Sequence, residues 1–475
     1  MTTAKNSPMP VTDQDPRLRV LNDQPVRTNG EFVLYWMQMY RRPNDNASLS
    51  YALQKANEYN LPCLVYEALR PDYPHASDRF HTFVLEGARD TAAELSRCGL
   101  RHVFFLPKTP NEARGIVAKL AARAALVVSD DFPSFTIPAQ NAAAASRASC
   151  CFVAVDDNTS IPLALFPKAE LAARTLRPKL NRVLDTWLRP LEQPEPAVAP
   201  PMGLDLPFEP VAFDRVDLAA LVASCQIDHT VGPVADFPGG ACAAATRLER
   251  FVARRLSGFD QDRKTLDGGS GLSPYLHFGM ISARHIALTA RSWGQEHGLS
   301  VDAFLEQLVV RRTLAFNFAQ ANPDHRTYEA IPQWARTTLS QHESDPRTSV
   351  LDLTALMDAH SPDPLWNTCQ LDLRLRGMMP SYLRMLWGKL VLTWTKTPAD
   401  AHGILVYLND RFALDGRDPD GYANIAWCFG LHDRPFPQRA IYGTVRSMTS
   451  ASTQRKFDLS DYLGMERRWR QELGL

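Results

Sequence analysis

The chain lacks a net charge of either sign. Its 475 residues carry 52 basic and 52 acidic side chains, so the formal net charge at neutral pH is zero. A protein drawn to nucleic acid by its overall charge would be strongly basic, so any affinity for an acidic polymer must come from a local basic patch. Overall charge therefore leaves the class of partner open.

Cysteine is scarce, and its pattern excludes a zinc site of the usual kind. The eight cysteines include no CxxC pair and no Cys/His ligand spacing. We expect free thiols in a reducing compartment. There is no long apolar run of transmembrane length and no apolar N-terminal stretch of signal-peptide length, so we expect no membrane span and a cytoplasmic protein.

Short apolar runs alternate with helical stretches between residues 31 and 188. The runs are FVLYWM from Phe32, LPCLVYE from Leu61, RHVFFL from Arg101, AALVVSDD from Ala124 and CCFVAVDD from Cys150. This alternation predicts an α/β domain with a Rossmann-like parallel sheet over 31–188, preceded by an N-terminal extension over 1–30. GxGxxG is absent after the first run, which excludes a standard dinucleotide site at that turn.

A proline-rich segment separates this region from a second one. Residues 189–210 contain seven prolines, which neither a helix nor a central strand tolerates. We therefore predict an interdomain connector over 189–240. Helical periodicity then predicts an all-α domain over 241–475, with helices at 243–256, 282–294, 301–319, 382–396 and 398–408.

One segment of the second domain has the composition of a phosphate-binding turn. It reads DGGSGLSPYLHFG from Asp267 to Gly279, and Pro274 suits the first turn of a helix. Glycine permits close backbone approach, serine hydroxyls cap, and a helix start offers free N–H groups, which together suit a pyrophosphate. An ordinary capped loop has the same composition, so local chemistry leaves both interpretations open.

The segment also belongs to a pattern that runs along nearly the whole chain. SGLSPYLHFGMISA from Ser270 resembles the flavin-phosphate segment of photolyases and cryptochromes. Resemblance to class II cyclobutane pyrimidine dimer photolyases, in order and spacing, is carried by DPLWNTCQ at 363, YLRMLWGKLVLTW at 382, YLNDRFALDGRDPDGYANIAW at 407, FGLHDRPF at 429 and, in the first half, FVLYWMQ at 32, LEGARD at 85 and AARTLRPK at 172. The 407–427 block is the most specific of these.

This resemblance implies a light-driven flavoprotein, a carbon–carbon lyase that repairs DNA. It implies FAD in the helical domain, with phosphates at Ser270, Gly271, Leu272 and Ser273, and a second antenna chromophore of unidentified kind. Reduced FAD donates an electron to a pyrimidine dimer in DNA, the cyclobutane ring splits, and the electron returns, without a metal or a nucleophile. We expect a monomer that acts on dimer-containing DNA.

The resemblance also implies an indole relay that reduces FAD, formed by Trp366, Trp387 and Trp394. Trp387 and Trp394 are seven residues apart, which is two turns on one helix face and roughly 10 Å along its axis. That spacing suits stepwise electron transfer toward the surface. Apart from the resemblance, two tryptophans on a helix would be interpreted as core packing.

Three further residues match positions beside the flavin. Asn409 matches an asparagine near the flavin N5, although its place in LNDRF also fits a helix-terminal cap. Arg384 and Asp415 match an ion pair that stabilises the reduced flavin ring. Apart from the resemblance, they would be interpreted as an ordinary surface ion pair.

Substrate contacts follow from the same resemblance. Met385 and Trp427 match an apolar clamp for a flipped pyrimidine dimer. Arg263, Arg434 and Arg446 match arginines that contact DNA, and the stretch from Arg439 to Lys456 adds cations for phosphates. A solvated basic edge would have the same composition.

Several positions depart from the family pattern. The family pattern has a glutamate at one of these positions, whose carboxyl hydrogen-bonds the dimer and can donate a proton to it. This chain has Gln307 there, and an amide keeps the hydrogen bonds but cannot donate a carboxyl proton. Glu306 cannot take its place because it points about 100° away on a helix. Thr313, Phe316, Pro380 and Phe436 also depart.

The flavin-facing positions are kept and the substrate-facing ones drift. Two functions therefore stay open: repair of pyrimidine dimers, and a cryptochrome-like light sensor or repurposed photoenzyme that does not repair this lesion. A flavin-binding scaffold without photochemistry is a third.

Overall fold

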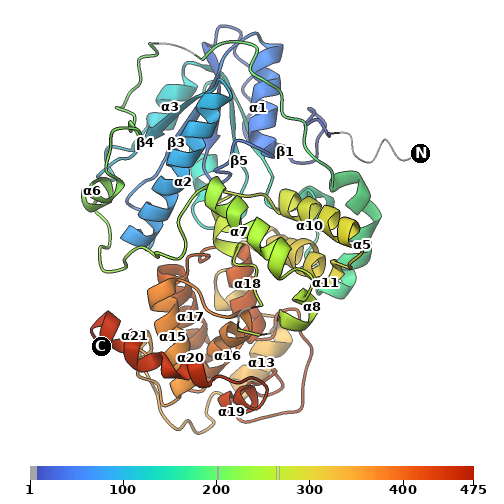
Figure 1. Ribbon diagram of the computed structural model, residues 1–475, viewed down its shortest axis with the longest axis vertical. Coiled ribbons are helices and arrows are strands. Elements are labelled where there is room, and N and C mark those ends of the chain that lie inside the picture. Colours follow the sequence, from blue (N-terminus) through green and yellow to red (C-terminus); the bar gives the residue numbers. More distant parts are fainter. Residues whose placement is uncertain (1–7, 201–202, 264, 267) are drawn as a thin grey trace.

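The computed structural model describes residues 8–200, 203–263, 265–266 and 268–475. A sheet with its helices forms one end of the molecule, and a cluster of helices forms the other (Figure 1). The predicted fold class, an α/β N-terminal domain and a helical C-terminal domain, is confirmed. None of the helices in the described part of the chain combines the length and apolar character needed to cross a membrane.

The sheet has six strands in the order β1-β6-β5-β2-β3-β4. They are β1 (Leu18–Val20), β2 (Phe32–Met37), β3 (Cys63–Ala68), β4 (Arg101–Phe105), β5 (Ala124–Asp130) and β6 (Cys151–Val155). The five predicted apolar runs form the five parallel strands. The short β1 was not predicted, and it pairs antiparallel with β6 at the sheet edge.

Both faces of the sheet are covered, as a parallel sheet requires. Side chains of β2 alternate between two cores: Val33 and Tyr35 pack with α1 (Ala47–Glu58), whereas Phe32 and Leu34 pack with α3 (Ile116–Ala121). The remaining helices of this region are α2 (Asp78–Arg97), α4 (Ile137–Ala145), η1 (Leu163–Leu165), α5 (Ala173–Trp187) and α6 (Leu218–Ala223).

The proline-rich part of the predicted connector lacks regular structure, as predicted, although the connector 189–240 also contains the helix α6. The described residues of 189–210 form no helix and no strand, and contribute one isolated bridge, from Met9 to Leu191. Residues 201 and 202 of this segment lie outside the described residues. The exact domain boundaries stay predictions.

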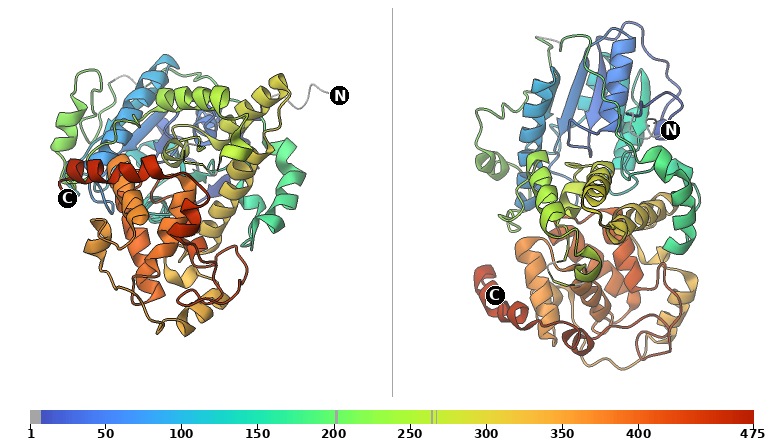
Figure 2. Two further views of the ribbon diagram at one scale, coloured as in Figure 1. Left: turned by 60° about the horizontal axis from the view of Figure 1, so that its bottom comes forward. Right: turned by 45° about the vertical axis from the view of Figure 1, so that its right-hand side comes forward.

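The helical part begins with α7 (Ala241–Arg254), α8 (Phe259–Asp262), α9 (Ser273–His277), α10 (Ala283–His297), α11 (Asp302–Leu305), the π-helical turn η2 (Glu306–Arg311) and α12 (Arg312–Ala321). It continues through η3 (Tyr328–Ala330), α13 (Gln333–Gln341), α14 (Leu353–Met357), α15 (Pro364–Arg376), α16 (Ser381–Val391), α17 (Pro398–Phe412), α18 (Pro419–Cys428), α19 (Ser450–Gln454), α20 (Ser460–Gly464) and α21 (Glu466–Leu473). Figure 2 shows these helices from two further sides.

Two predicted helices differ more from the observed ones than the others do. The predicted helix 301–319 is interrupted by η2, where each turn holds an extra residue. The predicted helix 382–396 ends at Val391. Threonine explains this early end: the Thr393 hydroxyl donates to the Leu390 carbonyl at 2.6 Å and that of Thr395 to the Val391 carbonyl at 3.1 Å, bonds that compete with helix continuation.

Close backbone contact joins the two ends of the molecule. Gly279, after α9, has φ +66°, and a Cβ there would lie 2.0 Å from the Met39 carbonyl oxygen, after β2. The Arg42 guanidinium donates to the Gly279 carbonyl at 2.9 Å. Arg79 of α2 likewise donates to the Leu373 carbonyl of α15 at 3.2 Å. The helical part is therefore held directly against the sheet.

Gly279→Ala should destabilise the protein. The left-handed backbone alone costs an alanine about 1–3 kcal/mol, and the clash with Met39 adds to this. The matched control is Gly403→Ala, because Gly403 lies inside α17 with open space around its Cβ position. That change should stabilise by about 0.5–1 kcal/mol. Urea unfolding of both variants measures the difference, and equal midpoints would contradict the predicted contact.

Candidate functional site

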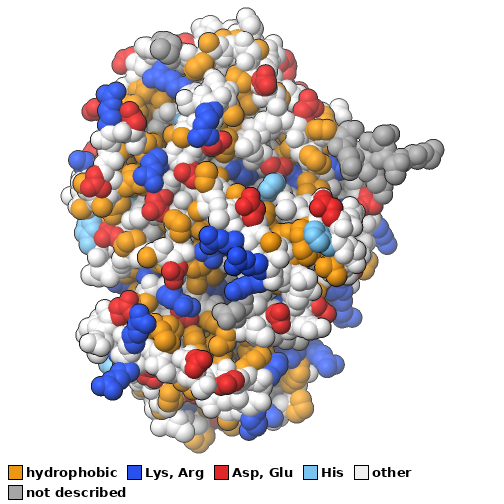
Figure 3. Space-filling view, in the orientation of Figure 1, with side chains coloured by type: hydrophobic (Ala, Val, Ile, Leu, Met, Phe, Trp, Pro, Cys, Tyr) orange, Lys and Arg blue, Asp and Glu red, His pale blue; other side chains and the backbone are white. Residues whose placement is uncertain are grey.

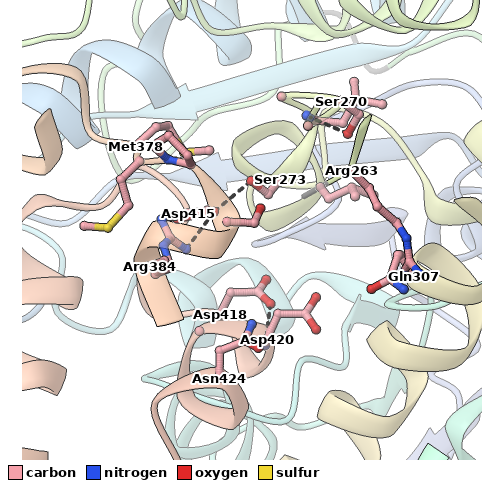
Figure 4. Close-up of a pocket in the computed structure, with 18 of the residues that line it drawn as sticks. Arg263, Ser270, Ser273, Gln307, Met378, Arg384, Asp415, Asp418, Asp420 and Asn424 are labelled. Carbon is pink, nitrogen blue, oxygen red and sulfur yellow. Dashed lines mark hydrogen bonds and ion pairs between the residues drawn. The ribbon is translucent and has the colours of Figure 1, made fainter. Parts of the chain in front are cut away.

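A cavity of about 1400 Å³ lies among α7, α8, α9, η2, α12, α16, α17 and α18. Sites for drug-sized ligands typically measure about 300–1000 Å³, so there is room for a large ligand and a second group. Most of the predicted site residues line it: Arg263, Ser270, Gly271, Leu272, Ser273, Gln307, Arg384, Met385, Trp387, Asn409, Asp415 and Trp427. Trp366, Trp394, Arg434 and Arg446 lie outside its lining. Figure 4 shows several of these side chains converging on it.

The predicted phosphate-binding turn borders the cavity, although Asp267 at its start lies outside the described residues. Gly271 has φ +68°, which favours glycine, and the Ser270 hydroxyl accepts the Leu272 N–H at 3.3 Å. A Cβ at Gly271 would lie 2.8 Å from Nη1 of Arg247 on α7. Absence of a side chain there lets a guanidinium lie against the turn, which suits an anionic ligand.

Asp415 connects this turn to α16. Its carboxylate accepts two hydrogen bonds from the Arg384 guanidinium, at 2.9 and 3.2 Å, and one from the Ser273 hydroxyl at 2.7 Å (Figure 4). The side chains of Arg384 and Asp415 are 19% and 10% exposed, so the pair is more than a solvated surface contact. Paired, fork-like hydrogen bonds fix the guanidinium plane along the cavity wall.

Asn409 is not a helix cap. It lies inside α17, which continues to Phe412, and its side chain is buried while bordering the cavity. Its amide nitrogen donates to the Asp410 carboxylate at 3.2 Å. A Cβ at Gly421 of α18 would lie 3.2 Å from that nitrogen, so the glycine admits the amide between the two helices.

The three predicted relay indoles are in contact as a chain, in an order that differs from their order in the sequence. Trp387 borders the cavity, Trp366 of α15 lies parallel to it at a centroid distance of 6.3 Å, and Trp394 meets Trp366 edge-on at 5.5 Å. The expectation of two turns on one helix face is wrong, because α16 ends at Val391. Trp366 bridges the other two indoles, and Trp394 is only 4% exposed.

The predicted clamp residues face the cavity from neighbouring helices, Met385 from α16 and Trp427 from α18. Gln307 lines it from η2. Glu306 is held elsewhere, with its carboxylate 2.7 Å from Arg177 Nη2 and 3.3 Å from Arg311 Nε. Glu306 therefore does not take the place of Gln307.

The remaining departures fall into three places. Pro380 lines the cavity at the start of α16. Thr313 and Phe316 are fully buried in α12, and Phe316 packs edge-on against Phe132 at 5.7 Å. These two are core positions, so their expected place facing a substrate is wrong. Phe436 lies under the Arg446 guanidinium at 4.2 Å.

Of the three predicted DNA-contacting arginines, one lines the cavity and two lie outside its lining, over the same phenylalanine ring. Arg263 lines the cavity. Arg434 and Arg446 lie over Phe436, at 5.6 and 4.2 Å from its ring centroid. The Arg446 guanidinium is bonded to the Asp433 carboxylate at 2.8 and 3.1 Å, which raises the pKa of Arg446.

Sequence reasoning missed two groups of lining residues. The first is a stripe on α7 formed by Arg247, Arg250 and Arg254, whose spacing places them on one helix face. That spacing was the available signal. The second is the acidic pair at the start of α18: Asp418 accepts from His277 at 3.1 Å, and Arg312 contacts Asp420 at 3.0 Å.

Burial raises the pKa of Asp420 to about 6 in spite of Arg312. Asp420 therefore changes charge within the range of ordinary buffers, beside the cavity.

The crevice of the sheet, between β2 and β5, is where doubly wound folds usually bind ligands. In this protein the buried Asp130 carboxylate accepts the backbone N–H groups of Gln38, Met39 and Tyr40 at 2.8, 2.7 and 3.0 Å, and the Tyr35 hydroxyl at 2.9 Å. The described residues do not identify a site for a second chromophore, so the antenna stays a prediction.

Comparison with known proteins adds the following findings. Residues 33–197 match the family model for DNA photolyase. Deoxyribodipyrimidine photo-lyase of Methanothermobacter thermautotrophicus is 35% identical over 94% of this chain and 97% of its own length. The protein of the same name from Oryza sativa subsp. japonica is 35% identical over 95% of this chain and 90% of its length.

Two solved structures share the fold. A Synechocystis cryptochrome matches 93% of this chain and 89% of its own, with a TM-score of 0.69 and 17% identity. A class III photolyase from Agrobacterium tumefaciens matches 93% of this chain and 87% of its own, with a TM-score of 0.68 and 16% identity. At these identities the likeness concerns the fold alone.

Proposed function

The chain belongs to the photolyase/cryptochrome family, and we propose that it is a class II-type photolyase, which binds FAD in the cavity and splits cyclobutane pyrimidine dimers in DNA with light. One observation carries the proposal: a single cavity brings together the phosphate-type turn, Asn409, the Arg384–Asp415 pair, the first relay indole and the apolar clamp.

The residues present fit FAD. The turn at Gly271 and the Arg247 guanidinium offer backbone approach and positive charge to a pyrophosphate. Arg384 would stabilise negative charge on the flavin ring, and Asp415 fixes its orientation. Bound and reduced, FAD supplies one electron to the dimer under light, and the electron returns after the ring splits.

The rest of the cavity suits a flipped base pair and its DNA. Met385 and Trp427 offer apolar faces to two stacked pyrimidines. Arg250, Arg254 and Arg263 line the same cavity and would contact phosphates. Figure 3 shows Lys and Arg side chains gathered over α7, which supplies the local basic patch that a chain of zero net charge needs.

The purified protein should be yellow and should release FAD on denaturation. After reduction and illumination it should restore the base absorbance of an oligonucleotide that contains a pyrimidine dimer. Arg384→Met should retain less FAD, because the reduced ring loses its cation. Colourless protein that takes up no FAD on reconstitution would refute the proposal.

Trp387→Phe should slow light-driven reduction of bound, oxidised FAD by at least about tenfold, because the remaining indoles no longer reach the cavity. The same variant, reduced chemically beforehand, should split dimers at the wild-type rate. Absorbance changes under continuous blue light measure the first step. Unchanged reduction would remove Trp387 from the relay.

A second candidate function, a light sensor that does not repair this lesion, is favoured by one observation: Gln307 lines the cavity where the family places a glutamate. Gln307→Glu restores the carboxyl proton donor and should raise dimer splitting about tenfold or more. Glu306→Gln is the matched control, since Glu306 faces Arg177 instead. No gain from Gln307→Glu, in a protein that repairs poorly, would support the sensor.

A further inference from the structure

Two indoles border the cavity, Trp387 and Trp427, and their surroundings differ. The Trp387 ring lies against the uncharged Trp366 and donates its N–H to the Gln370 amide at 3.0 Å. No cation–π contact among the described residues involves Trp387, Trp366 or Trp394. The Trp427 ring, by contrast, lies near two cations, Lys389 Nζ at 4.9 Å from its centroid and Arg446 Cζ at 5.8 Å.

Lys389 is a buried charge with a neutral partner. It lies on α16, two residues after Trp387, and its side chain is fully buried. Its ammonium donates to the Cys428 carbonyl at 2.6 Å. The Asp433 carboxylate, which acts on Lys389 electrostatically, is already bonded twice to Arg446. Burying an ammonium beside neutral groups is costly, and an apolar side chain of similar length would avoid the cost.

We infer that Lys389 is a positioning residue that prevents Trp427 from donating an electron, so that light-driven oxidation at the cavity falls on Trp387. Lys389 is not among the residues that line the cavity, and it acts through the Trp427 ring. The inference rests on the proposed function, because it concerns which indole reduces the bound flavin.

Coulomb's law supplies the reason. An indole that loses one electron to the excited cofactor gains one positive charge. On Trp427 that charge would lie 4.9 Å from the Lys389 ammonium. At an effective dielectric constant of about 20, this repulsion disfavours oxidation of Trp427 by about two orders of magnitude. On Trp387 the same charge lies beside the neutral Gln370 amide. Trp366 then gives an electron to Trp387, and Trp394 gives one to Trp366, so the positive charge moves away from the cavity.

Trp427 also differs in where its charge could go. Among the described residues no aromatic ring stacks on Trp427, whereas Trp387 has Trp366 beside it. Oxidised Trp427 would hold its charge until the electron returned from the flavin, which wastes the absorbed light. It would also place a cation in the clamp where the dimer is to lie.

The protonation state of Lys389 gives the inference a pH signature. Burial lowers the pKa of Lys389 to about 8. The groups that face it hold their charge between pH 7 and 9: burial raises the pKa of the Cys428 thiol to about 11, and Arg446 and Asp433 stay ion-paired. Burial also lowers the pKa of His432, which lines the cavity, so its ring is neutral in this range. Raising the pH above 8 should therefore release Trp427.

The test begins from Trp387→Phe, where the first relay indole is missing. At pH 7 its light-driven FAD reduction should be slow. Adding Lys389→Met should speed it at least about tenfold, and adding Trp427→Phe to that pair should remove the gain. Raising the pH from 7 to 9 should give Trp387→Phe the same gain, and should leave the variant that also carries Lys389→Met unchanged. Equal rates with and without the Lys389→Met change would overturn the inference.

A second readout needs neither light nor bound flavin. A charge beside an indole shifts its near-ultraviolet bands, so circular dichroism of the purified protein should change with a midpoint near pH 8. The change should vanish in Lys389→Met and in Trp427→Phe. Its persistence in Lys389→Met would overturn the inference. Protein that shows this titration but binds no FAD would instead refute the proposed function, and the pH comparison on Trp387→Phe serves if Lys389→Met fails to fold.

Discussion

The carboxylate of Asp415 is the contact on which the site depends. It lies between the end of α17 and the start of α18, and it holds both the Ser273 hydroxyl and the Arg384 guanidinium. Three parts of the chain that are distant in sequence are thereby fixed around one cavity. Arg384 shares α16 with Met385, Trp387 and Lys389, so the orientation of that helix sets clamp, relay and buried cation together. A single helix thus carries the ion-paired arginine, the clamp methionine, the first relay indole and the buried lysine.

Proximity to the sheet adds a second constraint. The backbone of Gly279 meets that of Met39 without a side chain between them, and α9 leads directly into this contact. Because α9 starts at Ser273, the turn at Gly271 has little freedom to move relative to the sheet. The α/β region therefore acts as a rigid support for a site whose described lining residues belong to the helical part and the segment that leads into it.

Much of the fold could be predicted from the sequence, because buried parallel strands consist of continuous apolar runs. The strand β1 was missed because its three residues, Leu18 to Val20, are half-buried or exposed and form no such run. The end of α16 was missed because threonine side chains, which sequence periodicity ignores, compete for its last carbonyls. Hydrophobic periodicity therefore failed at the end of α16, where side-chain hydrogen bonds to the backbone decide where the helix stops.

The site was predicted mainly through family resemblance, and its geometry required tertiary contacts. The position of Trp366 between Trp387 and Trp394 depends on how α15 packs on α16, which spacing within one helix cannot show. Arg247 was missed because its role appears only once Gly271 is seen beside it. Thr313 and Phe316 were misplaced because departure from a family pattern does not reveal burial, and both side chains are fully buried in α12.

The π-helical turn η2 has a consequence for which side chain faces the cavity. The extra residue in η2 offsets everything before it by one position against α12. Rewinding this turn to α-helical geometry with all its residues kept would rotate the preceding segment by about 100° against α12. The π-helical winding of η2 therefore decides that the Gln307 amide, and not a neighbouring side chain, reaches the cavity wall.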